Sequence, residues 1–261
     1  MKPVTFHVHT SFCDGADAPE ALVKRALELG CEAIGFSGHS YTFFDESYCM
    51  SAEGTAAYRR EVARLKEAYR DRIRVYLGVE QDYYSDVPTD GHDFVIGSVH
   101  YVRKDGKYLP VDDGRQKQID AVEQGYGGDW YAFVEDYYRA VSDVVRKTGC
   151  DIIGHFDLVT KYNRGGVFFD EGHPRCLAAR DAALAALLQT QAAFEVNYRA
   201  AATGLRTVPY PAPEVIDAII RAGRPLVYSS DCHEAKDLLF GFDDCVRRYE
   251  KYLISPETLI K

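Results

Sequence analysis

The sequence predicts an α/β fold in which a parallel β-sheet is covered by helices. Three observations lead to this prediction. Short β-branched segments alternate along the chain with segments of helical periodicity, which is typical of parallel sheets. Seven such strands with short crossovers suit either a barrel or a doubly wound sheet. Neither a G-x-G-x-x-G motif after the first strand nor a Walker A motif occurs, which disfavours a nucleotide-binding sheet.

The strands and helices can be placed along the chain one by one. The expected strands are Pro3–His9, Ala33–Gly38, Ile73–Glu80, Phe94–His100, Asp151–His155, Ala193–Asn197 and Pro225–Ser230. The expected helices are Ala18–Leu29, Ser51 to about Arg72, Asp129 to about Lys147, His173–Leu188 and Pro213–Ala222. Asp17 and Glu20 can form a capping box at the start of the first helix, and Gly30 can end it. Residues 101–128 show little periodicity, and we expect an irregular excursion over one face, as in a lid.

The composition excludes several classes of protein. The 261 residues include 31 Lys and Arg against 40 Asp and Glu, a net charge of −9, which disfavours binding to nucleic-acid backbones. No apolar run approaches the ~18–20 residues that span a membrane, and the first residues lack a signal-peptide core. The seven cysteines are scattered and form no C-x-x-C motif, which indicates a reducing, cytoplasmic environment. Nothing in the sequence predicts an oligomeric state.

Six of the eight histidines fall at the carboxyl ends of expected strands. They are His7, His9, His39, His100, His155 and His233. The carboxyl ends of parallel barrel strands meet on one face, so these imidazoles should converge there with Glu80 and Asp231. Imidazole and carboxylate together suit Zn, Mn or Fe(II). His7 and His9 point to the same side of a strand, so both can bind one metal ion. The sequence therefore predicts a metal site at this end of the sheet.

Six ordered segments that span residues 7–233 point to a known family. They are His7-Val-His9-Thr with Cys13-Asp14-Gly15, Gly38-His39, Gly78-Val-Glu80, Gly97-Ser-Val-His100, Gly154-His155-Phe-Asp157 and Asp231-Cys-His233. In this order they resemble the motifs of the polymerase and histidinol phosphatase (PHP) family, specifically its histidinol-phosphatase branch. The resemblance implies a distorted (β/α)7 TIM-like barrel, with residues 1–261 forming a single PHP barrel domain.

The resemblance also implies three divalent metal ions, which can be Zn, Mn or Fe. It assigns the first ion to His7, His9, Glu80 and Asp231, the second to Glu80, His100 and His155, and the third to Asp14, His39 and His233. Glu80 would then bridge two ions. Asp14 follows from the resemblance alone, since nothing about its position in a turn distinguishes it.

The activity implied is hydrolysis of L-histidinol phosphate to L-histidinol and phosphate, a step of histidine biosynthesis. Two metal ions ~3.5–4 Å apart can hold a hydroxide that attacks phosphorus in line with the leaving alcohol. Asp231 or His233 is expected to protonate that alcohol. The alternative is a PHP phosphatase for another small ester, such as a nucleotide, a sugar phosphate or phosphotyrosine. A non-catalytic PHP module is disfavoured by the complete ligand set, and an amidohydrolase by the absence of a strand-end lysine.

The substrate contacts are less clearly marked than the metal ligands. Guanidinium and ammonium groups bind phosphate, and the candidates in loops on the site face are Lys161, Arg164, Arg199 and Arg206. Candidates for contacts with the ammonium and imidazole of the substrate are Tyr41, Asp82, Tyr83 and Glu234.

Overall fold

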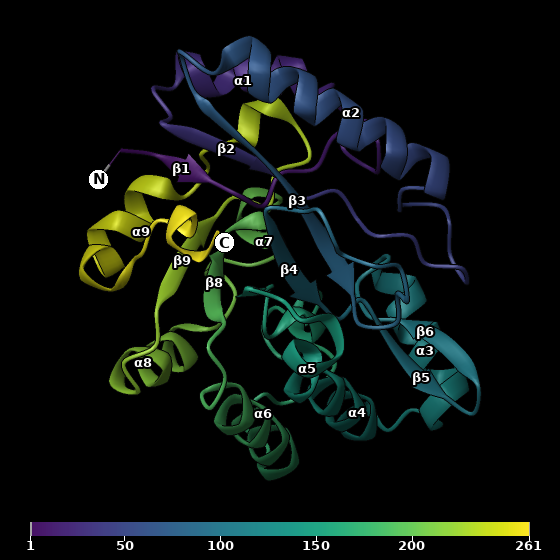
Figure 1. Cartoon of the computed structure of the whole chain (residues 1–261). Coiled ribbons are helices and arrows are strands. Elements are labelled where there is room, and N and C mark those ends of the chain that lie inside the picture. The colour runs from purple at the N-terminus through teal and green to yellow at the C-terminus, as the bar shows by residue number, and fades with distance from the viewer. Residues whose placement is uncertain (1, 261) are drawn as a thin grey trace.

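The structure is a computed structural model that describes residues 2–260, and at its centre lies a ring of parallel strands (Figure 1). The strands of the ring are β1 (Val4–Thr5), β2 (Ala33–Phe36), β3 (Arg74–Asp82), β4 (Phe94–Ser98), β7 (Ile152–Ile153), β8 (Ala193–Asn197) and β9 (Leu226–Ser229). They lie in that order, and each pairs in parallel with the next. Beyond β1 and β9, Val8 forms a parallel bridge with Cys232, which nearly closes the ring. The predicted seven-stranded, distorted TIM-like barrel is confirmed for the part of the chain described.

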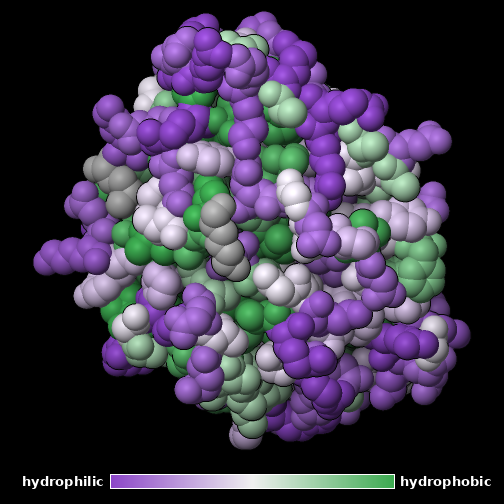
Figure 2. Space-filling view, viewed as in Figure 1, coloured by the Kyte–Doolittle hydropathy of each residue, from purple (hydrophilic) through white to green (hydrophobic). Residues whose placement is uncertain are grey.

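Most of the helices lie around the outside of the barrel. The α-helices of the described residues are α1 (Pro19–Glu28), α2 (Ala52–Tyr69), α3 (Arg115–Tyr126), α4 (Trp130–Ser142), α5 (Val144–Thr148), α6 (Pro174–Leu187), α7 (Arg199–Ala202), α8 (Pro213–Arg221) and α9 (Phe242–Tyr249). Short 3-10 helices lie at Leu158–Thr160, Ala235–Asp237, Glu250–Tyr252 and Pro256–Leu259. Apolar side chains of α1 such as Leu22 and Val23 are buried, whereas hydrophilic side chains cover most of the outer surface seen in Figure 2. Between residues 2 and 260, no helix combines the length and apolar composition that a membrane span requires.

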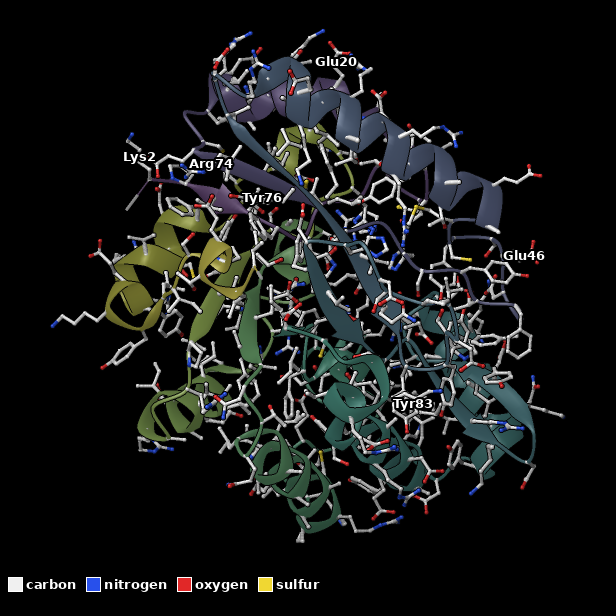
Figure 3. All side chains as sticks on the ribbon, in the orientation of Figure 1. Lys2, Glu20, Glu46, Arg74, Tyr76 and Tyr83 are labelled. Atoms are coloured by element: carbon white, nitrogen blue, oxygen red, sulfur yellow. The ribbon has the colours of Figure 1, made fainter. Side chains whose placement is uncertain are left out.

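The amino-terminal end of the barrel is filled by apolar packing. Phe6 and Phe94 lie inside it with ring centroids 4.7 Å apart. Gly78 in β3 makes room for the Phe94 ring, because a Cβ there would lie 2.1 Å from it. The C-terminal segment packs over this end, where the hydroxyl of Tyr76 (labelled in Figure 3) donates to Glu257 at 2.6 Å. The open end of the barrel is therefore the one formed by the carboxyl ends of the strands.

Five of the seven strands are shorter than predicted, and β1 and β7 differ most. β7 comprises Ile152–Ile153 instead of Asp151–His155, and β1 is likewise two residues long. At the end of β7, the N–H of His155 donates to the side chain of Glu195 at 2.8 Å. The backbone there has left the sheet ladder and is held by a side chain of the neighbouring strand.

The start of α1 differs from the predicted capping box. Its N-cap is Ala18, which makes no side-chain cap. The carboxylate of Asp17 accepts the N–H of Ala235 at 2.7 Å, and Glu20 accepts from Arg64 at 2.6 Å. The predicted box was wrong because both carboxylates bind partners that are distant in the sequence.

Residues 101–128 contain a hairpin and a helix, so the prediction of an irregular excursion was wrong. β5 (Tyr101–Lys104) and β6 (Lys107–Pro110) pair in antiparallel fashion, and α3 follows them. The two residues between these strands, Asp105 and Gly106, have φ angles of 49° and 81°. An Asp-Gly pair favours this kind of two-residue hairpin turn, so the sequence did contain the information.

Candidate functional site

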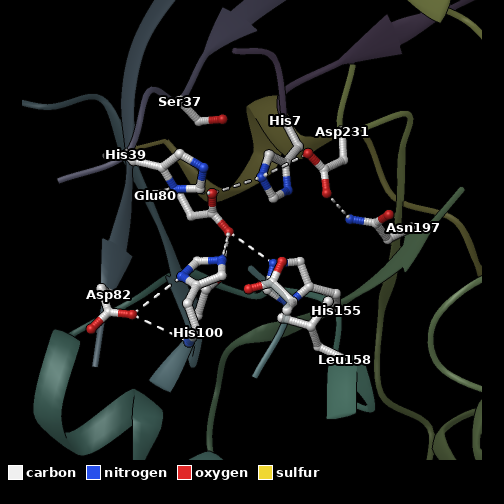
Figure 4. A network of polar contacts seen from close by, with 12 residues as sticks. His7, Ser37, His39, Glu80, Asp82, His100, His155, Leu158, Asn197 and Asp231 are labelled. Carbon is white, nitrogen blue, oxygen red and sulfur yellow. Dashed lines mark hydrogen bonds and ion pairs between the residues drawn. The ribbon is translucent and has the colours of Figure 1, made fainter. Parts of the chain in front are cut away.

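The predicted ligand residues gather at the carboxyl ends of the strands, and Figure 4 shows His39, His100 and His155 around Glu80. The side chains brought together are His7, His9, Asp14, His39, Glu80, His100, His155, Asp231 and His233. Most of them are buried, whereas the side chains of Asp14 and His233 keep 32% and 17% of their surface exposed. The structure thus brings all nine together, and their roles as metal ligands stay a prediction.

Glu80, near the end of β3, occupies the middle of this group. Its Oε2 lies 2.9 Å from Nδ1 of His39 and 3.2 Å from Nε2 of His7. Its Oε1 lies 2.9 Å from Nε2 of His155 and 3.4 Å from Nε2 of His100. Nε2 of His9 also lies 3.5 Å from Oε2. Each carboxylate oxygen therefore faces its own set of imidazoles, which is the arrangement expected of a carboxylate that bridges two cations.

Five buried polar atoms in this group make no hydrogen bond. One is Nδ1 of His155, and the other four lie together: Nε2 of His7, Nε2 of His9, Oε2 of Glu80 and Oδ1 of Asp231. The Asp231 oxygen lies 3.2 Å from the His9 nitrogen and 3.6 Å from the His7 nitrogen, so the atoms face one another. Unpartnered buried polar atoms are rare and cost free energy. One divalent cation would satisfy all four, and the donor types suit Zn, Mn or Fe(II), so the residues present fit a metal ion.

The loop after β1 brings Asp14 to the outer edge of the group. Its Oδ2 lies 3.2 Å from Nε2 of His233, and its Oδ1 lies 3.6 Å from Nε2 of His39. Gly15 permits this turn, because a Cβ there would lie 2.4 Å from the backbone nitrogen of Thr10. Asp14 thereby joins ligands from two distant strands.

The distances between donor atoms define three overlapping groups of described residues that can hold an ion. These groups are His9 with Asp14, His39 and His233; His7 with His9 and Glu80; and His39 with Glu80 and His100. His9 and His39 each belong to two groups, whereas the family resemblance assigns each to one ion. The structure supports several adjacent cation positions along one wall.

The opposite charges of the group shift one another's pKa values. Burial alone would raise the pKa of Glu80, but the imidazoles of His7 and His39 outweigh it and hold that pKa well below its ordinary value. Burial would lower the pKa of His7, but carboxylates led by Asp231 outweigh it and raise that pKa well above its ordinary value. His9 differs, because burial and the neighbouring imidazoles lower its pKa to about 3. Its ring is therefore neutral, as a metal ligand must be.

Sequence reasoning missed two polar residues behind the ligands. Oε1 of Glu195 lies 2.5 Å from Nδ1 of His7, and Nδ2 of Asn197 donates to Asp231 at 2.9 Å. Both come from β8, whose five residues are all buried. A charged residue inside a short apolar strand was the available indication, since buried charges need partners.

A cavity of about 430 Å³ opens onto this group, a volume suited to a small ligand. Besides the predicted ligands, its wall includes Tyr48, Tyr101, Asp112, Lys161, Arg199 and Glu234. Lys161 donates to the carboxylate of Asp112 at 2.9 Å. The cavity therefore offers cationic groups for an anion and carboxylates for a cation.

Two of the four predicted phosphate contacts line the cavity and two do not. Lys161 and Arg199 belong to its wall, whereas Arg164 and Arg206 do not. Arg164 is exposed to solvent. Arg206 is 8% exposed, and its guanidinium lies 3.6 Å from the carboxylate of Asp157. Arg164 faces solvent and Arg206 is held in a buried ion pair, so neither lines the cavity, and their role as phosphate contacts stays a prediction.

Of the four candidates for the organic part of the substrate, Glu234 lines the cavity. Asp82 lies behind His100, with Oδ2 3.2 Å from its Nδ1. Tyr41 and Tyr83 donate to acidic residues away from the cavity, and Figure 3 shows Tyr83 in the lower part of the molecule. Asp82 is therefore placed to orient a histidine rather than to contact substrate.

Known proteins resemble this chain in sequence and in structure along nearly its whole length. The family model described as PHP domain matches residues 5–199. A Deinococcus radiodurans protein named "Probable histidinol-phosphatase" is 28% identical over 92% of this chain and 90% of its own. The histidinol-phosphatase of Bacillus subtilis is 26% identical over 93% of this chain and 97% of its own. The structure of histidinol phosphate phosphatase from Lactococcus lactis with Zn, L-histidinol and phosphate is 22% identical, with a TM-score of 0.67 over 96% of this chain and 94% of that one. Because the family model spans well over half of its residues, the chain belongs to the PHP domain family.

Proposed function

We propose that this protein is a metal-dependent phosphomonoesterase that hydrolyses L-histidinol phosphate to L-histidinol and phosphate. The relatives named histidinol-phosphatase support this substrate, because they match nearly the full length of the chain. The proposal includes residues 1–261 acting as a single PHP barrel domain in the cytoplasm during histidine biosynthesis. All seven cysteines are free, as a reducing compartment requires.

One observation carries the proposal above all. Four buried donor atoms without hydrogen-bond partners face one another beside a cavity that also holds Lys161 and Arg199. A metal centre next to these cationic side chains suits an anion whose negative charge must be neutralised before a nucleophile can attack it. A phosphate monoester is such an anion.

The proposed metal complement is three divalent ions, with Zn, Mn and Fe all suited to the donors. The ions would be held by His7, His9, Glu80 and Asp231; by Glu80, His100 and His155; and by Asp14, His39 and His233. When bound, the ions would act as Lewis acids: they would neutralise charge on the phosphoryl oxygens and lower the pKa of bound water to about 7.

The chain's own groups bind the ester and supply a proton. The planar guanidinium of Arg199 can donate to two phosphoryl oxygens at once, and Lys161 can exchange the carboxylate of Asp112 for a third. Asp231 or His233, at the edge of the group, is proposed to pass a proton to the leaving oxygen, directly or through a water molecule. These two residues lie next to each other at the open edge of the group, with Nδ1 of His233 3.1 Å from the Asp231 carbonyl oxygen.

A substrate panel tests the proposed function. The purified protein, loaded separately with Zn²⁺ and Mn²⁺, is assayed for phosphate release from L-histidinol phosphate, a nucleotide, a sugar phosphate and phosphotyrosine. We expect histidinol phosphate to exceed the other esters in kcat/KM by orders of magnitude. We also expect chelation to abolish turnover and metal to restore it. Similar kcat/KM values for all four esters would contradict the proposed substrate and indicate a PHP phosphatase without a preference for histidinol phosphate.

A further inference from the structure

Glu195 of β8 lies behind the metal centre and contacts several of its parts at once. Its side chain is 1% exposed. Oε1 lies 2.5 Å from Nδ1 of His7. Oε2 accepts the backbone N–H of His155 at 2.8 Å and the side-chain N–H of Asn197 at 2.9 Å. One carboxylate therefore connects the chain after β1, the chain after β7, and β8 itself.

Asn197 extends this connection to the chain after β9. Its Nδ2 donates to Oδ2 of Asp231 at 2.9 Å (Figure 4), while its Oδ1 accepts the N–H of Arg199 at 2.9 Å. Oδ1 of Asp231, the other carboxylate oxygen, stays free to face the Nε2 atom of His9. Residues 195 and 197 point to the same side of β8, since side chains of a strand alternate with a period of two.

The contact with His7 determines which nitrogen of that ring faces the cation position. A carboxylate at Nδ1 keeps the proton on Nδ1, so Nε2 retains its lone pair. That Nε2 lies 3.2 Å from Oε2 of Glu80, among the atoms that lack hydrogen-bond partners. Glu195 thereby orients the ring and fixes its tautomer.

We propose that Glu195 is the positioning residue that assembles the metal centre, acting through His7, the backbone of His155, and Asn197 with Asp231. It contacts neither substrate nor cation. This inference rests on the proposed function only in requiring that the centre bind divalent cations, whatever ester the protein hydrolyses.

Glu195→Gln tests the proposal because it keeps the shape and removes the charge. Both oxygens of Glu195 accept hydrogen bonds, so the amide group must place its NH₂ against a donor at one of the two positions. We expect the affinity for Zn²⁺, measured by competition with a chromogenic chelator, to fall about 10–100-fold. The unfolding of the metal-free variant is measured in urea alongside.

Glu257→Gln is the matched control, because Glu257 is partly buried, with 22% of its side chain exposed, and accepts hydrogen bonds but lies at the opposite end of the barrel. It should keep wild-type zinc affinity.

Asn197→Asp is the second variant, since it sets a carboxylate against both Glu195 and Asp231, and it should weaken zinc binding as well. If Glu195→Gln does not fold, this variant carries the test.

Weaker zinc binding in a variant with unchanged metal-free stability supports the positioning role. Wild-type zinc affinity in Glu195→Gln overturns it, and so does a loss of stability with no loss of affinity, because a merely structural residue would behave in this way. Failure of the wild-type protein to hydrolyse histidinol phosphate would refute the proposed function and leave this inference standing.

Discussion

At the scale of single residues, Arg199 and Arg206 show that residue type and loop position do not determine role. Both follow β8 and both were plausible phosphate contacts from the sequence. The structure places Arg199 in the cavity wall and Arg206 against Asp157. Burial raises the pKa of Asp157, and the neighbouring guanidinium only partly opposes that rise. Arg206 therefore compensates a buried charge.

Methionine at each position separates the two roles. Arg206→Met leaves Asp157 buried without its partner and should lower the free energy of unfolding by about 3–5 kcal/mol. Arg199→Met should change stability by less than about 0.5 kcal/mol, since that residue lies in a cavity wall. It should reduce kcat/KM for histidinol phosphate about 100-fold, which corresponds to about 2.7 kcal/mol. Urea unfolding and phosphate release measure these effects, and the opposite pattern would identify Arg206 as the clamp.

At the scale of elements, the strands were predictable because each is a short β-branched segment between turns. The convergence of six histidines followed from their shared position at strand ends. Asp14 could be found only through the family resemblance, because it lies in a loop whose path depends on Gly15. Glu195 and the β5–β6 hairpin were missed for different reasons. The contact of Glu195 with His7 joins residues 188 positions apart, whereas the Asp-Gly turn was present in the sequence and was overlooked.

The packing inside the barrel makes a prediction about β3. Gly78→Ala should lower the free energy of unfolding by about 1–3 kcal/mol, because the new Cβ would lie 2.1 Å from the Phe94 ring. Gly172→Ala is the control, since its Cβ meets only the side chain of Asp170, at 3.2 Å. Urea unfolding of the metal-free proteins measures both. Equal stabilities of the two variants would show that the barrel interior has free space.

At the scale of the whole molecule, the barrel is closed at one end by its C-terminal segment and carries opposed charges at the other. Without cations, the buried carboxylates hold protons on neighbouring imidazoles. Burial would lower the pKa of His100, but carboxylates led by Glu80 outweigh it and raise that pKa from 6.5 to about 10. With cations bound, metal ions would take the place of those protons.

This exchange predicts that pH affects the stability of the metal-free and zinc-bound forms differently. A raised histidine pKa contributes stability that is fully present below the unfolded value of 6.5 and is lost as pH rises through the folded value of about 10. The chelated protein should therefore have a lower Tm at pH 9 than at pH 6.5. The increase in Tm caused by zinc should grow over the same interval, because metal competes with protons for the imidazoles. A chelated protein whose Tm rises with pH would contradict this exchange.

The central claim is that one carboxylate, Glu80, organises a metal centre on which hydrolysis depends. The most direct measurement compares Glu80→Ala with the wild-type protein for bound metal, by elemental analysis, and for phosphate release from L-histidinol phosphate. We predict that the variant folds, retains little bound metal and loses turnover by more than about 10³-fold, or about 4 kcal/mol. A variant that keeps wild-type metal content and turnover would contradict the claim.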